Sequence, residues 1–178
     1  MTSTLVFNIS QFFPSLNHWL LMWIIYKAGL DTRVIRFFSN YLMERKTNYL
    51  WNNFSSPFFN INIGVGQGST LSPILSALYL SSFLYILEKC LKNLKIFVSI
   101  ISFVDDGLFI SQDKSLNVSN SCLFCSYNIM TNLLDKFDLI VEYSKTEVFH
   151  FSRLHGPFNP PLLDLSPLGE LILSSKNS

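Results

Sequence analysis

Two adjacent acids, Asp105 and Asp106, lie between apolar runs rich in β-branched residues in the stretch FVSIISFVDDGLFISQ, residues 97–112. An Asp-Gly pair between two apolar runs predicts a tight hairpin, which accounts for Asp106 and Gly107. The hairpin does not account for Asp105, because neighbouring carboxylates repel each other unless a cation lies nearby. A metal site and an ordinary turn are both open on these residues alone.

The composition of the chain limits what could surround this pair. A length of 178 residues suits one domain with a real core. Charged residues make up 14% and the formal net charge is +1, so the chain lacks the strong basic field of an autonomous nucleic-acid binder. Any contact with nucleic acid must be local, or must depend on other segments.

The cysteines and histidines do not form a recognisable site. Three cysteines are too few, and odd in number, for a disulfide framework, which indicates a reducing, intracellular compartment. Cys122 and Cys125 form a C-x-x-C, but no second pair or His follows at zinc-ligand spacing. They are interpreted as small apolar residues on one helix face. His18 and His150 are interpreted as structural.

A membrane location is weighed on the stretch LSPILSALYLSSFLYIL, residues 71–87, which carries no charge. Its 17 residues reach the lower edge of a spanning helix. Its serines and Pro73 lower its mean hydropathy, and the charged residues Glu88 and Lys89 follow it directly. The stretch is therefore predicted to be a buried core helix that makes no membrane contact. No basic segment of a signal peptide precedes the first apolar run. A small membrane or scaffold protein stays as an alternative function.

The apolar pattern predicts alternating strands and helices with no internal repeat, hence an α+β fold. Pro14 suits a first helical turn and Asp31 suits an N-cap. The predicted strands cover 4–10, 47–51, 58–65 across a Ser-Ser-Pro turn, the two arms of the hairpin, and a strand pair across 143–152. The predicted helices cover 14–29, 32–44, 71–94 and 116–138. Prolines crowd the last residues, so 153–178 is predicted to be an irregular arm.

The order of four segments along the chain is informative about its family: FNISQFFPSL (7–16), GVGQGSTLSP (64–73), FVDDG (103–107) and VEYSKTEVFHF (141–151). This series resembles motifs A to D in the palm of reverse transcriptases, most closely those of non-LTR, LINE-like retrotransposons. Each motif is weak alone, but the ordered set is specific, and the likeness covers Leu5 to Ser152. It implies a polymerase palm fragment over residues 1–152, an antiparallel sheet with helices packed on one face, and fingers and thumb largely missing.

The resemblance also implies the chemistry of RNA-directed DNA synthesis. Members of the family add deoxynucleotides from triphosphates to a DNA primer on an RNA template, using two Mg²⁺ ions. Asp105 and Asp106 would be the motif C metal ligands, because Mg²⁺ prefers carboxylate oxygens. A third carboxylate, from motif A, bridges both ions in the family.

The motif A position departs from the family pattern, because it is occupied by Asn8. An amide offers one neutral carbonyl oxygen, which cannot bridge two Mg²⁺ ions as a carboxylate can. Losing that ligand is expected to lower the rate about 10²-fold or more. The sequence therefore predicts weakened Mg²⁺ binding and impaired catalysis, and a non-catalytic palm that still binds nucleic acid is the alternative.

Other positions match the family's nucleotide site. Phe13 would act as the steric gate against a 2′-OH, although it could also be a core Phe. Gln67 and Gly68 would lie against the template base and incoming nucleotide, although they could also form an ordinary strand-to-helix loop. Lys145 would donate a proton to the leaving pyrophosphate, although a lone Lys in a turn is often merely solvated.

Overall fold

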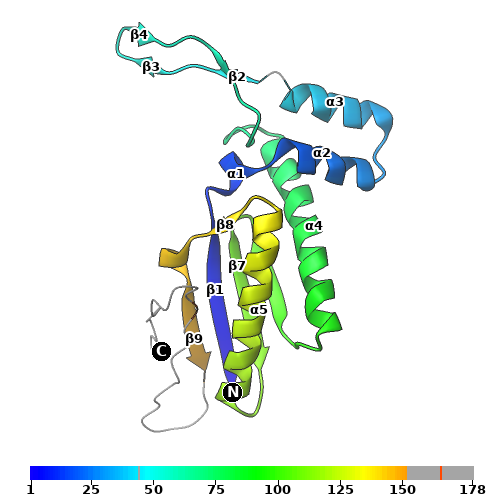
Figure 1. Cartoon of the computed structure of the whole chain (residues 1–178), viewed down its shortest axis with the longest axis vertical. Coiled ribbons are helices and arrows are strands. Elements are labelled where there is room, and N and C mark those ends of the chain that lie inside the picture. Colours follow the sequence, from blue (N-terminus) through cyan, green and yellow to red (C-terminus); the bar gives the residue numbers. More distant parts are fainter. Residues whose placement is uncertain (44, 152–164, 166–178) are drawn as a thin grey trace. The chain divides into compact units, whose positions relative to one another are not determined.

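The chain divides into two compact units in a computed structural model that describes residues 1–43, 45–151 and 165. Unit 1 comprises Met1–Ser10 and Phe83–Ser178, and unit 2 comprises Gln11–Ser82. The predicted arm at 153–178 lies outside the described residues except for Leu165, which is buried. Figure 1 labels the α-helices and most of the strands of the two units.

Unit 1 is built on an antiparallel sheet with β1 at its centre (Figure 1). The strand β1 pairs with β7 on one side and with both β8 and β9 on the other, and β6 pairs with β7. The strands are β1 Thr2–Ser10, β6 Ser99–Phe103, β7 Asp106–Gln112, β8 Ile140–Val141 and β9 Glu147–Phe151.

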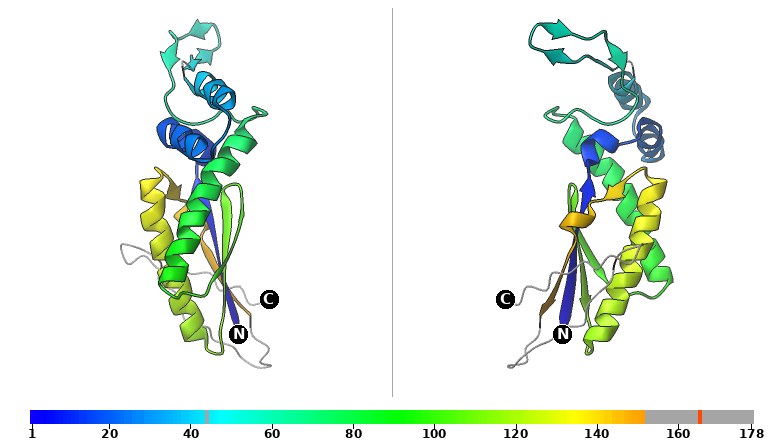
Figure 2. Two further views of the ribbon diagram at one scale, coloured as in Figure 1. Left: turned by 90° about the vertical axis from the view of Figure 1, so that its right-hand side faces the viewer. Right: turned by 60° about the vertical axis from the view of Figure 1, so that its left-hand side comes forward.

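Two helices lie on one face of this sheet. Figure 2 shows α5 (Leu116–Lys136) and the part of α4 (Ser72–Asn93) that belongs to unit 1, from Phe83 onward, on the same side. The inward-facing residues of β1, Leu5, Phe7 and Ile9, are at most 2% exposed, as period-two alternation requires for a half-buried strand. The predicted α+β fold, with an antiparallel sheet and helices on one face, is confirmed.

The predicted helices at 71–94 and 116–138 are confirmed as α4 and α5, and the predicted strand at 4–10 as β1. Within the residues that the structure describes, α4 is the one helix long and apolar enough to cross a membrane, and 39% of its most apolar window is buried. A core helix of a globular protein meets the same criteria, so this observation does not by itself indicate a membrane.

The hairpin turn of unit 1 lies two residues earlier than the Asp-Gly pair predicts. Phe103 pairs with Asp106, so the turn consists of Val104 and Asp105, and Val104 adopts a φ of 56°. A β-branched residue is strained at a positive φ. Gly107 lies instead in β7, directly opposite Phe7, where a Cβ atom would overlap the Phe7 ring. The glycine is thus required by packing between strands, not by the turn.

The predicted strand pair across 143–152 is also wrong in its pairing. Residues Tyr143–Lys145 form a short 3₁₀ helix, η1, between β8 and β9. Both flanking strands pair with β1 rather than with each other. Within the predicted range, only β9 is extended chain, and β8 lies before it. The choice of partner depended on β1, which is at least 130 residues away in the sequence.

Unit 2 is helical at its start, and its first predicted helix is divided in two. Leu16 is extended at ψ 116°, and the Asn17 side chain caps the next helix by accepting from the Leu20 amide. The predicted cap at Asp31 is confirmed by its bond from the Arg33 amide. The helices are α1 Phe12–Ser15, α2 His18–Lys27, α3 Thr32–Leu42 and the part of α4 up to Ser82.

The two strands predicted for unit 2 form a narrow ribbon of four short strands. Its outer turn is Asn52–Asn53, with Asn52 at φ 51°, rather than the predicted Ser-Ser-Pro turn. Asn tolerates this left-handed conformation better than most residues. The strands are β2 Lys46–Thr47, β3 Leu50–Trp51, β4 Phe54–Ser55 and β5 Phe59–Asn60, with β2 paired to β5 and β3 to β4.

Candidate active site

The two acids of unit 1 lie beside Asn8 at the end of the central strand. Asp106 is the first residue of β7 and stands directly opposite Asn8 in the register of the sheet. The Ile9 amide donates to the Asp105 carbonyl oxygen at 2.8 Å, which ties the turn to β1. Because Asn8 alternates with Phe7 and Ile9, its side chain points to the face opposite α5. The side chains of Asn8, Asp105 and Asp106 thus lie together at this end of β1.

The Asn8 amide bridges the two carboxylates. Its Nδ2 donates to Asp106 Oδ1 at 2.8 Å and to Asp105 Oδ2 at 3.2 Å. One NH₂ group carries two N–H donors, so a single side chain serves both acids. The opposite orientation would place the amide oxygen against two carboxylates, so the chemistry requires this one. Asn8 is only 8% exposed, and its two bonds offset the repulsion between Asp105 and Asp106.

This set of groups does not fit the two-ion site of the family. Among residues 1–43, 45–151 and 165, no three His, Cys, Asp or Glu side chains converge as they would around a metal ion. Mg²⁺ requires oxygen ligands, whereas Asn8 directs N–H groups at the oxygens that an ion would need. Where the resemblance implies a bridging acceptor, Asn8 presents a hydrogen-bond donor.

Unit 2 brings Phe13 next to the glycine-rich loop. The Val65 amide donates to the Phe13 carbonyl oxygen at 2.8 Å, and the Gly64 amide donates to the Leu16 carbonyl oxygen at 2.7 Å. Phe13 is half-buried, and Gln67 and Gly68 are exposed, with Gly68 at φ +84°. The structure therefore groups Phe13 with the loop in unit 2, and Asn8 with the acids in unit 1.

The carbonyl of Gly64 anchors this loop. It accepts from His18 Nε2 at 2.6 Å and from Arg45 Nη1 at 2.7 Å. Gly64 itself is at φ +76°, and a Cβ atom there would overlap the backbone of Pro14. The structural role predicted for His18 is confirmed. Arg45 was not predicted, and no sequence pattern indicates it, because its partner is a backbone carbonyl.

Lys145 lies at the end of η1, in the same unit as the acids, and is exposed. The segment that carries it is tied to β1, because the Glu142 amide donates to the Asn8 carbonyl oxygen at 2.8 Å. Ser10 and Ser144 both donate to the Glu142 carboxylate, at 3.2 and 2.8 Å. Glu142 was not among the predicted site residues, although its acidic side chain inside motif D is a usable signal.

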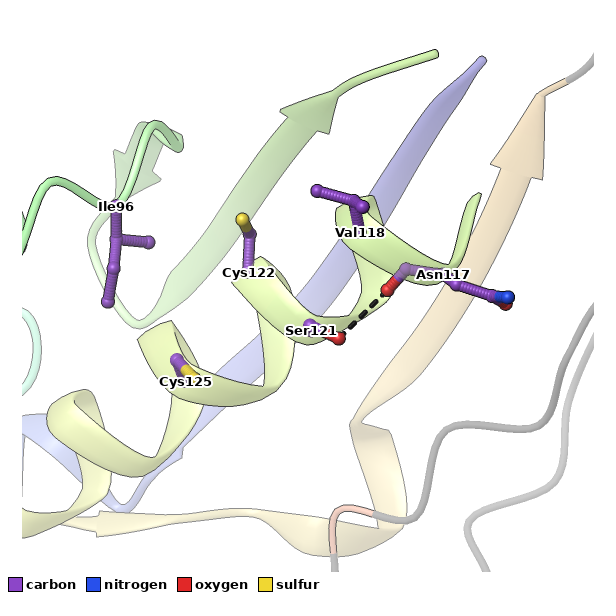
Figure 3. A pocket seen from close by; sticks show the side chains of 6 residues that line it. All are labelled: Ile96, Asn117, Val118, Ser121, Cys122 and Cys125. Atoms are coloured by element: carbon purple, nitrogen blue, oxygen red, sulfur yellow. Dashed lines mark hydrogen bonds between the residues drawn. The ribbon is translucent and has the colours of Figure 1, made fainter. Parts of the chain in front are cut away.

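His150 and the C-x-x-C pair lie away from the acids: His150 is in β9, and the two cysteines are on α5. His150 is hydrogen-bonded through Nδ1 to Ser3 Oγ at 2.9 Å, and burial lowers its pKa, as expected for a structural role. Cys122 and Cys125 line one open pocket of about 300 Å³ on α5 (Figure 3). Burial, followed by Cys125 and Asp113, raises the pKa of Cys122, so less of this thiol is ionised at neutral pH.

An antiparallel sheet covered by helices on one face, with paired acids at a hairpin beside its central strand, defines a polymerase palm. The chain belongs to the reverse transcriptase (RNA-dependent DNA polymerase) family, whose sequence model matches residues 2–170. Nucleic acid is the partner class of that family. No curated protein sequence matches the chain.

Solved structures of telomerase resemble this fold. Apo telomerase from Candida tropicalis matches with a TM-score of 0.67 at 16% identity, over 83% of this chain and 28% of that one. The same enzyme truncated from its C-terminal domain matches with a TM-score of 0.54 at 19% identity, over 83% of this chain and 30% of that one. Candida albicans telomerase in complex with a TWJ fragment of telomeric RNA matches with a TM-score of 0.54 at 16% identity, over 93% of this chain and 29% of that one. The chain spans less than a third of each, and at these identities the likeness concerns the fold alone.

Proposed function

We propose that this chain is the palm of a non-LTR, LINE-like reverse transcriptase that does not support DNA synthesis as it stands. The proposal is carried by one observation: Asn8 occupies the motif A position and donates to both motif C acids. In intact members, that position would hold the carboxylate that bridges two Mg²⁺ ions beside the RNA template, DNA primer and deoxynucleoside triphosphate.

Asn8 impairs this chemistry in two ways. It removes one negative charge and one bridging ligand from the site, which lowers the affinity for divalent cations. Its amide also occupies an oxygen of each remaining acid, so a cation would have to displace hydrogen bonds to charged groups, each contributing about 1.5–3 kcal/mol. The expected loss of rate is about 10²-fold or more.

The other roles follow from the family motifs and belong to the same proposal. Phe13 excludes a ribose 2′-OH, Gln67 and Gly68 contact the template base and incoming nucleotide, and Lys145 approaches the triphosphate. Residues 1–152 carry these motifs. The bond from the Val65 amide to the Phe13 carbonyl supports the pairing of the gate with the loop.

A palm that binds nucleic acid without catalysis is the second candidate. It is favoured by the distribution of charge between the units. Unit 2 carries five basic residues against two acidic ones, a formal charge of +3, while the whole chain carries +1. Such a unit attracts a polyanion locally, even though the chain as a whole is nearly neutral.

Primer extension tests the proposal directly. The chain should bind a labelled DNA primer on an RNA template in a salt-dependent manner. It should not extend that primer with deoxynucleotides, in Mg²⁺ or in Mn²⁺, beyond the background given by an Asp105→Asn/Asp106→Asn variant. That variant is the matched control, because it removes both acids and keeps the side-chain volumes. Extension well above its level would show that Asn8 is an adequate ligand.

A further inference from the structure

Four aromatic rings form a row along the ribbon of unit 2. Trp51 of β3 stands directly opposite Phe54 of β4, so their side chains share one face. Tyr49 precedes Trp51 by two residues and therefore points to that same face. The Tyr49 ring in turn contacts Phe59 of β5, with centroids 5.3 Å apart and planes tilted by 36°. We call Tyr49, Trp51, Phe54 and Phe59 the aromatic row.

The aromatic row is open to solvent. Tyr49, Trp51 and Phe54 are 69%, 76% and 64% exposed, and Phe59 is 40% exposed. Single exposed aromatics are ordinary, but a contiguous set on one narrow element marks a binding surface. By the same alternation, Asn48 and Ser55 lie on the opposite face of the ribbon, where they hydrogen-bond to each other at 2.9 Å. A row of flat, solvent-exposed rings suits a ligand that itself has flat faces, because such faces stack on aromatic rings.

The charge around the row is one-sided. The chain has no Asp or Glu from Arg45 to Leu87, while Arg45 and Lys46 stand at the base of the ribbon. Of the twelve acidic residues in the chain, ten belong to unit 1. A surface with exposed rings, basic residues at its base and no acids is complementary to a polyanion that carries aromatic bases. An apolar peptide or an uncharged lipid surface would not require this exclusion of acids.

We propose that the aromatic row is a stacking site for single-stranded nucleic acid. Residues two apart on a strand are about 6.6–6.8 Å apart, close to two stacked base steps of about 3.4 Å. Bases can therefore stack on or between successive rings while Arg45 and Lys46 contact the phosphates. The inference takes nucleic acid as the partner from the proposed function, but it does not involve Asn8 or the two acids.

The test is binding of a 5′-labelled oligo(dT) or oligo(U) to the full chain, followed by fluorescence anisotropy. Trp51→Ala/Phe54→Ala should raise the Kd about tenfold or more, because stacking contributes about 1–3 kcal/mol per base. Trp51→Phe should bind nearly as the parent does. Lys46→Ala should reduce the salt dependence of binding by about one counterion. Trp19→Ala is the matched control, since Trp19 is 84% exposed on α2, outside the ribbon, and should leave the Kd unchanged.

Two results would overturn the proposal. The first is an unchanged Kd for the Trp51→Ala/Phe54→Ala variant. The second is that this variant abolishes self-association in sedimentation without affecting oligonucleotide binding, which would assign the row to a second copy of the chain. Oligonucleotide binding is measured without nucleotide addition, so it is read independently of Asn8 and the two acids. Failure of the stacking site would thus leave the primer-extension result unchanged, and the two proposals are tested separately.

Discussion

A palm with Asn8→Asp, grafted between the fingers and thumb of an intact reverse transcriptase, should extend primers about 10²-fold or more faster than the same graft with Asn8. The substitution restores a carboxylate opposite Asp106 in the sheet register and removes the N–H groups that occupy the acids. Both grafts present primer and triphosphate through the same surrounding domains, so positioning contributes equally to each. The measurement is single-turnover primer extension on an RNA template in Mg²⁺.

The control for this comparison is Asp106→Asn in each graft. It should abolish extension by the graft that carries Asn8→Asp, because the restored site again loses a carboxylate. It should have little effect on the extension rate of the graft that keeps Asn8, because that graft is already impaired. Equal rates from the grafts with and without Asn8→Asp would contradict the role assigned to this position.

Gly64→Ala should lower the free energy of unfolding of unit 2 by about 2–5 kcal/mol. Two costs combine at this position: a non-glycine residue at φ +76° costs about 1–2 kcal/mol, and overlap of the new Cβ with the Pro14 backbone adds about 1–3 kcal/mol. All three tryptophans, Trp19, Trp23 and Trp51, belong to unit 2. Urea unfolding followed by tryptophan fluorescence therefore reports on this unit.

Gly29→Ala is the matched control for this variant. Gly29 also has a positive φ, +71°, but a Cβ atom there would have no atom within 4 Å. It should incur only the backbone cost of about 1–2 kcal/mol. Equal decreases in the free energy of unfolding for the two variants would mean that the backbone around Pro14 adjusts freely to a Cβ atom at position 64. Gly64 would then not hold the loop against Phe13.

The elements with strong internal periodicity could be predicted from the sequence, and those that depend on a distant partner could not. The helices α4 and α5 and the strand β1 carry their own apolar pattern. The turn at Val104–Asp105 does not follow local preference, because Gly107 is needed opposite Phe7. In the same way, β8 and β9 pair with β1, a choice that no local alternation indicates.

The candidate site shows the same division. Motif order identified Asn8, Asp105 and Asp106 as a group, and the register of β1 and β7 brings them together. The direction of the Asn8 amide could not be predicted, because it depends on where both carboxylates lie in space. The segregation of acids into unit 1 is likewise invisible in a net charge of +1. It appears only when the units are known.

The central claim is that the Asn8 amide takes the place of a cation between Asp105 and Asp106, and hydrogen exchange in the β6–β7 hairpin tests it most directly. Mass spectrometry of peptides spanning residues 99–112, in EDTA and in excess Mg²⁺, should show the same protection in the parent chain under both conditions. Asn8→Asp brings three carboxylates together, so it should exchange roughly tenfold faster in EDTA and regain protection in Mg²⁺. Peptides from α5 serve as the internal reference. Protection of the parent hairpin by Mg²⁺, or an Asn8→Asp hairpin that is equally protected in EDTA, would contradict the claim.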